Sequence, residues 1–189
     1  GHSLRGKTLG IIGMGRIGRG VAKRALAFEM HIIYYNRHSV GEELEGFLGH
    51  AKRVPLEELL RTSDAVFINA PLNDETYHMI STEQLNMMKP DAYLFNQGRG
   101  QIIDEAALIA HLKAGKLAGA GLDVFETEPN INPELLAMRN VVVTAHMATA
   151  TYEDKAEMVA AAGRNIMDFL ERGETPNIVN PDVLSRLKA

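Results

Sequence analysis

The first residues whose spacing points to chemistry are glycines at the boundary between an expected strand and an expected helix. An apolar run that ends at Ile12 leads into the pattern Gly-x-Gly-x-x-Gly, and a helical pattern begins inside it. In this context Gly13 permits a tight turn, Gly15 lets a pyrophosphate approach the backbone, and Gly18 lets helix and strand pack closely. Free N–H groups at the helix start would hold the phosphates, with Arg16 as an added cation. The predicted cofactor-binding residues of this loop are Gly13, Gly15, Arg16, Ile17 and Gly18.

The second expected strand ends in Asn36-Arg37-His38, and the first carboxylate after it is Glu42. NAD sites usually carry an acidic residue about 20 residues after the glycine loop, where it binds the ribose 2′-hydroxyl. Such a carboxylate would repel the 2′-phosphate of NADP, whereas Arg37 and His38 can form charge-assisted hydrogen bonds with that phosphate. We therefore predict NADP(H) rather than NAD(H), with Asn36, Arg37 and His38 in the site. The alternative is a solvated strand end in an NAD-binding protein.

Three later blocks, also at expected strand ends, carry polar side chains in a fixed order. They are the block with Arg99, the block with Asp123 and Glu128, and the block with His146. Open parallel sheets bind their ligands at the carboxyl ends of the strands, so these side chains are expected to face one site.

Taken with the glycine loop, these blocks resemble the D-isomer-specific 2-hydroxyacid dehydrogenases. The resemblance runs from about Leu4 to Val183, and its further segments are Ala70-Pro71-Leu72, Glu75-Thr76 and Asp104-Glu105. It implies an NADP(H)-dependent oxidoreductase acting on a small 2-oxo or 2-hydroxy acid of the glyoxylate or hydroxypyruvate type. Two alternatives are an NAD-dependent phosphoglycerate- or lactate-type dehydrogenase and a nucleotide-sensing module similar to the corepressor relatives of these enzymes.

The resemblance implies a catalytic role for Arg99, Glu128 and His146. A planar guanidinium can grip a carboxylate, which suits Arg99 for substrate binding. An imidazole can donate and take back a proton near neutral pH, which suits His146 as the general acid, with Glu128 fixing its tautomer. The sequence departs from the family at Ala145, where proline is usual. The remaining histidines have no comparable carboxylate block and are assigned no catalytic role: His2, His31, His38, His50, His78 and His111.

The resemblance also extends the predicted cofactor site. It places Asp123 at the nicotinamide carboxamide, and Pro71 and Thr76 at the nicotinamide ribose. No group of histidines or carboxylates has metal-ligand spacing, so we predict no metal.

The elements that must position these residues alternate along the chain. Expected strands cover residues 8–12, 32–35, 65–68, 93–96, 118–122 and 141–144, and expected helices cover 16–28, 56–60, 82–87 and 105–113. In the first helix Ile17, Val21, Ala25 and Phe28 share one face. Strands alternating with helices require crossover connections, which predicts an α/β fold with a doubly wound parallel sheet of the Rossmann type.

The C-terminal part follows a different pattern. Apolar residues from Tyr152 to Leu170 recur at spacings of four and three, which predicts a long helix ended by Arg172-Gly173 and followed by an extended tail. This helix either covers the sheet or reaches toward another partner. We interpret residues 1–3 as a remnant of cloning or a domain cut, 4–150 as a dinucleotide-binding domain, and 151–189 as a segment that would pack on a substrate domain absent from this chain.

Composition excludes several classes. The 189 residues are 46% hydrophobic and 23% charged, and the net charge of −4 argues against a nucleic-acid partner. There is no cysteine, hence no disulfide or thiol chemistry, and no apolar run reaches the length of about 18 residues that a membrane span needs. We expect a soluble, cytoplasmic protein and, by the resemblance, a homodimer.

Overall fold

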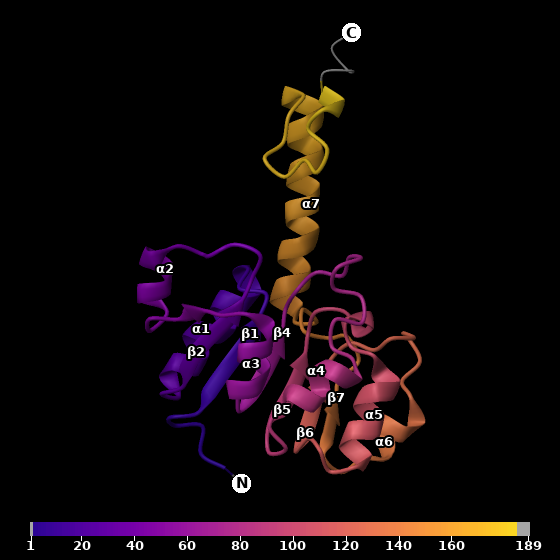
Figure 1. The fold of residues 1–189 in the computed structure, drawn as a ribbon. Coiled ribbons are helices and arrows are strands. Elements are labelled where there is room, and N and C mark those ends of the chain that lie inside the picture. Colours follow the sequence, from indigo (N-terminus) through magenta and orange to yellow (C-terminus); the bar gives the residue numbers. More distant parts are fainter. Residues whose placement is uncertain (1, 185–189) are drawn as a thin grey trace. The chain divides into compact units, whose positions relative to one another are not determined.

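The computed structural model describes residues 2–184 and divides into two compact units, Gly1–His146 and Met147–Ala189 (Figure 1). The first unit is built on one sheet and the second on one long helix. In the part of the chain that is described, no helix is long and apolar enough to span a membrane.

Seven strands, all parallel to their neighbours, form the sheet of the first unit in the order β3-β2-β1-β4-β5-β6-β7. Their bounds are β1 Thr8–Ile12, β2 His31–Tyr35, β3 Lys52–Arg53, β4 Ala65–Ile68, β5 Tyr93–Asn96, β6 Gly119–Leu122 and β7 Val141–Val143. The order reverses direction at β1 and β4, and ligands of doubly wound sheets bind at such a switch point. The predicted fold class is therefore confirmed.

Apolar cores lie on both faces of the sheet, and because successive strand residues point in opposite directions, β1 contributes to both cores. Ile11 packs into one core with Ala22 of α1 (Arg16–Ala27), whereas Ile12 packs into the other. That second core also contains apolar residues of α3 (Leu56–Thr62), α4 (Thr82–Met87) and α5 (Glu105–Lys113). The remaining helices of this unit are short: α2 (Glu42–Phe47), α6 (Pro133–Ala137) and the 3₁₀ turn Gly100–Ile102.

The expected face of α1 is partly wrong. Ile17 and Phe28 are mostly exposed, and the residues that α1 buries are Gly18, Ala22 and Ala25. Small side chains on this face let the helix approach the sheet closely, which bulky side chains at the same positions would prevent.

The second unit contains α7 (Tyr152–Arg172), whose two ends follow from the sequence. The Thr151 side chain accepts a hydrogen bond from the Asp154 N–H at 3.0 Å and so caps the first turn. Gly173 ends the helix with a φ of +71°, a conformation that glycine adopts without strain. No residue of α7 is buried, and Tyr152, Val159 and Leu170 of the apolar stripe are largely exposed.

Candidate active site

The glycine loop joins β1 to α1 at the carboxyl end of the sheet. Gly13 has a φ of +96°, and a Cβ there would lie 2.7 Å from the Ala70 nitrogen. A Cβ on Gly18 would lie 2.3 Å from the Gly13 carbonyl oxygen, so both positions require glycine for close packing. A Cβ on Gly15 would meet no atom within 4 Å, which leaves the backbone open to an approaching ligand.

The end of β2 is tied to this loop. The Met14 N–H donates to Asn36 Oδ1 at 2.8 Å, so the predicted site residue Asn36 holds the loop in place. Arg53 of β3 donates from Nε to the Asn36 carbonyl at 2.9 Å and from Nη2 to the Arg37 carbonyl at 2.7 Å. These bonds fix the backbone that presents Arg37. Arg53 is a contributor that the sequence pattern did not indicate, because its partners are backbone carbonyls distant in sequence.

A cavity of about 490 Å³ opens between the glycine loop, the end of β2 and the segment after β4. The predicted cofactor-binding residues that line it are Gly13, Gly15, Asn36, Arg37, His38, Pro71 and Thr76. Arg16, Ile17, Gly18 and Asp123 are not among its lining residues, whereas Arg19, three residues after Arg16 on α1, is one of them.

Asn69 is a second contributor that the sequence pattern did not indicate. It follows β4 and lines the cavity, and its buried side-chain nitrogen and oxygen make no hydrogen bond with the described residues. A buried amide without a partner costs about 1–3 kcal/mol, which makes such a group ready to bind a polar ligand. Together with the open backbone at Gly15, Asn69 shows that the cavity fits a dinucleotide.

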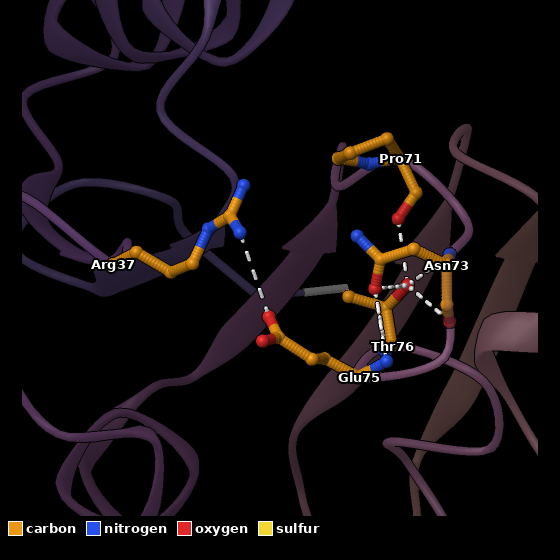
Figure 2. Close-up of polar contacts among 5 residues, drawn as sticks. All are labelled: Arg37, Pro71, Asn73, Glu75 and Thr76. Carbon is orange, nitrogen blue, oxygen red and sulfur yellow. Dashed lines mark hydrogen bonds and ion pairs between the residues drawn. The ribbon is translucent and has the colours of Figure 1, made fainter.

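The segment from Pro71 to Thr76 forms a tight turn at the cavity rim (Figure 2). Thr76 Oγ1 donates to the Pro71 carbonyl at 2.7 Å and accepts from the Asn73 N–H at 2.9 Å. Thr76 therefore holds the turn together from within. On the same turn Glu75 Oε2 lies 3.7 Å from Arg37 Nη1.

The His146 and Glu128 side chains form a pair at the ends of two other strand connections. The imidazole Nδ1 lies 2.8 Å from Glu128 Oε2, and the Phe125 N–H donates to Glu128 Oε1 at 2.9 Å. Burial alone would raise the pKa of Glu128, but the hydrogen bonds from His146 and Phe125 and the charges of His146 and Arg99 lower that pKa below its ordinary value. Glu128 is thus held as a carboxylate beside a half-exposed imidazole, which it contacts through Nδ1.

The backbone also fixes His146. Its φ is +49°, a left-handed conformation, and its N–H donates to the Asp123 carbonyl at 2.8 Å. The buried Asp123 accepts a hydrogen bond from Thr144 Oγ1 at 2.5 Å through its own carboxylate. Asp123 therefore connects the end of β6 to the segment that carries His146, in addition to the cofactor role predicted for it.

Arg99 follows β5 and lies close enough to Glu128 for its charge to lower the pKa of that carboxyl. Its Nη1 donates to the Gly98 carbonyl at 2.7 Å, and its own carbonyl accepts from Asn96 Nδ2 at 2.9 Å. Of the three residues predicted to be catalytic, His146 and Glu128 are therefore in direct contact, and Arg99 acts on Glu128 through its charge.

One expectation about the histidines is wrong. His78 does have a carboxylate partner, because its Nε2 lies 2.6 Å from Glu126 Oε1. Glu126 also accepts from the Glu105 N–H at 3.3 Å. The two glutamates of the same block thus serve different histidines, Glu126 pairing with His78 and Glu128 with His146.

Within residues 2–184, no group of three or more histidines, aspartates or glutamates could hold a metal ion.

The doubly wound sheet, the glycine loop and the adjacent imidazole–carboxylate pair define a nicotinamide-cofactor-binding domain of an oxidoreductase. Residues 1–148 match the model of the D-isomer specific 2-hydroxyacid dehydrogenase NAD binding domain. The chain belongs to this family.

Known relatives carry the comparison further. The glyoxylate reductase of Thermococcus litoralis is 48% identical over 185 residues, which are 98% of this chain and 55% of that protein. The crystal structure of a glyoxylate reductase from Paecilomyes thermophila superimposes with a TM-score of 0.90 at 44% identity, covering 96% of this chain and 55% of that one. D-mandelate dehydrogenase of Rhodotorula graminis, in its holo form, gives 0.86 at 39% identity, covering 89% and 49%. The chain spans about half the length of the curated relatives it matches.

Proposed function

We propose that this chain is the cofactor-binding part of a reductase that transfers a hydride between NADP(H) and a small 2-oxo or 2-hydroxy acid of the glyoxylate or hydroxypyruvate type. The observation that carries the proposal is the pairing of His146 with Glu128 beside Arg99 in a domain whose relatives are named glyoxylate reductases. When bound, the nicotinamide supplies or accepts the hydride.

The chain's own residues would supply the rest of the chemistry. Arg99 would bind the substrate carboxylate and polarise the adjacent carbonyl. His146 would donate a proton from Nε2 to the carbonyl oxygen during reduction and take it back during oxidation, an effect typically worth about 10²–10⁴ in rate. Glu128 would orient the ring by accepting from Nδ1 and would stabilise the protonated imidazole.

The proposed preference for NADP(H) rests on the end of β2. Arg37 and His38 line the cavity, and the chain has no acidic residue between Asn36 and Glu42. The guanidinium and the imidazole can share a 2′-phosphate, and each charge-assisted hydrogen bond contributes about 1.5–3 kcal/mol. Asp123, Pro71 and Thr76 are proposed to contact the nicotinamide side of the cofactor.

The segment 151–189, of which residues 185–189 lie outside the described part of the chain, is proposed to pack on a substrate domain, which would complete the site and exclude water from it. Without that domain the chain is expected to bind the cofactor and to turn over little substrate. We further propose that the complete enzyme is a dimer.

Cofactor preference is tested by titrating NADPH and NADH into the chain and into R37Q, with K23Q as a control for loss of a surface cation on α1. We expect R37Q to weaken NADPH binding at least tenfold and to leave NADH binding within about twofold. Equal losses for both cofactors would show that Arg37 does not select the phosphate.

The reaction is tested in a full-length protein that carries this chain. NADPH oxidation is measured with a panel of 2-oxo acids, glyoxylate and hydroxypyruvate included, for the unsubstituted protein and for H146A. We expect activity on at least one acid and a loss of about 10²-fold or more in H146A. Binding of NADPH without activity on any acid would favour a nucleotide-sensing role instead.

A further inference from the structure

The Glu75 carboxylate lies beside Arg37 in the cavity where Arg37 is proposed to bind the 2′-phosphate. Glu75 and Arg37 both line this cavity, and their charged groups face each other at 3.7 Å (Figure 2). The two side chains come from different connections, Arg37 from the end of β2 and Glu75 from the turn after β4. The end of β2 itself carries no acidic residue, but Glu75, from a segment distant in sequence, places a carboxylate beside it.

The position of Glu75 is built into the turn. Asn73 Oδ1 accepts from the Glu75 N–H at 3.0 Å and from the Thr76 N–H at 3.1 Å. The Thr76 hydroxyl closes the same turn by its bond to the Pro71 carbonyl. On the other side, Arg53 fixes the backbone at Arg37. The two backbones that carry this ion pair are therefore held in place, although both side chains are about seven-tenths exposed.

We propose that Glu75 is a specificity-determining residue that limits the preference for NADP(H) over NAD(H). This inference rests on the proposed function, in which Arg37 binds the 2′-phosphate. A phosphate that approaches Arg37 must displace or share the Glu75 carboxylate, and at a few ångströms the two anions repel each other. The uncharged ribose 2′-hydroxyl of NAD(H) meets no such repulsion and can donate a hydrogen bond to the carboxylate.

The other cations near the Arg37–Glu75 pair do not neutralise the Glu75 carboxylate through an ion pair in the described part of the chain. Arg37, His38 and Arg19 line the cavity, and the Arg53 guanidinium donates to the Asn36 and Arg37 carbonyls. Among the residues described, Arg37 is the cation that forms an ion pair with Glu75. Removing the carboxylate therefore frees this guanidinium for the phosphate.

The test compares E75Q with D74N, which removes the same charge one position earlier, from an exposed side chain that forms no ion pair with Arg37 in the described part of the chain. Dissociation constants of NADPH and NADH are measured calorimetrically at low ionic strength. We expect E75Q to tighten NADPH binding by about three- to tenfold and to leave NADH binding unchanged or up to about twofold weaker. D74N should change either constant by less than about twofold. Because the pair is exposed, E75Q should unfold at the same temperature as the unsubstituted chain.

Two further measurements separate this inference from the proposed function. In an R37Q background the gain in NADPH affinity from E75Q should fall to less than about half, and in about 1 M salt it should largely disappear. If R37Q weakens NADPH binding but E75Q leaves it within twofold, or if D74N gives the same gain, the role of Glu75 is refuted and that of Arg37 stands. If R37Q leaves NADPH binding unchanged, the proposed phosphate site itself is refuted.

Discussion

Two glycines of the same loop are expected to respond in opposite ways to the same added methyl group. In G15A the Cβ would meet no atom within 4 Å, and the φ of −75° suits alanine. Alanine lowers the conformational entropy of the unfolded chain, which stabilises the fold by about 0.4–1 kcal/mol. Alanine is also a poorer helix N-cap than glycine, and this destabilisation offsets the gain. We therefore expect a Tm within about 3 °C of the unsubstituted chain, together with at least a tenfold loss in NADPH affinity, because the methyl group occupies the approach of the pyrophosphate.

In G18A the Cβ would lie 2.3 Å from the Gly13 carbonyl oxygen, which is 0.7 Å short of the 3.0 Å that real Cβ contacts respect. Since the obstacle is backbone, the loop or α1 must shift, at a cost of about 1–3 kcal/mol. For a unit of 146 residues this corresponds to a fall in Tm of roughly 3–10 °C.

Both variants are checked by thermal unfolding followed by circular dichroism and by calorimetric titration of NADPH. A G15A variant that binds NADPH normally would refute the assignment of the phosphates to this loop. A G18A variant with unchanged Tm would show that helix and strand do not need the close contact that the structure describes.

Four other substitutions probe ionisable groups. Burial would raise the pKa of Asp64, but the hydrogen bond from the Thr8 N–H and the charges of two lysines lower that pKa below its ordinary value. The Asp64 carboxylate should therefore stabilise the fold at pH 7, and this stabilisation should be lost as the pH falls below about 4. D64N should lower the Tm at pH 7 but not at pH 3, whereas the control D91N should leave the Tm unchanged at both. Glu128 also has a lowered pKa, so the Tm difference between E128Q and the unsubstituted chain should likewise shrink below about pH 4. Finally, H78A and E126A should each destabilise the chain by about 0.5–2 kcal/mol in chemical denaturation, and the double variant should lose less than the sum; full additivity would refute their pairing.

Several elements, short ones among them, could be predicted because apolar residues recur in them at strand or helix spacing. The strands β1, β4 and β5 and the helices α4 and α5 have the expected bounds, and α7 ends at the expected Arg172. The elements that were missed are short. β3 consists of two charged residues, α2 buries none of its residues, and α6 has only five residues, so none of them shows a clear apolar pattern.

The placement of some candidate site residues could be predicted from chain order, whereas their roles were implied by the family resemblance and stay predictions. His146, Glu128 and Arg99 each follow a strand, so parallel packing alone brings them to one edge of the sheet. Arg53, Asn69 and Glu75 act through backbone carbonyls, an unpartnered amide or a contact between distant loops, none of which leaves a local signature.

The two-residue strand β3 has a consequence for how copies of this chain behave when crowded. It is an edge strand of the sheet and has few free backbone groups, and its two residues, Lys52 and Arg53, have exposed cationic side chains. A strand of a second copy could form few hydrogen bonds with β3, and pairing two copies of β3 would bring their cationic side chains together. Arg53, which donates hydrogen bonds to the backbone beside the cavity, therefore also disfavours edge-to-edge aggregation at this edge strand.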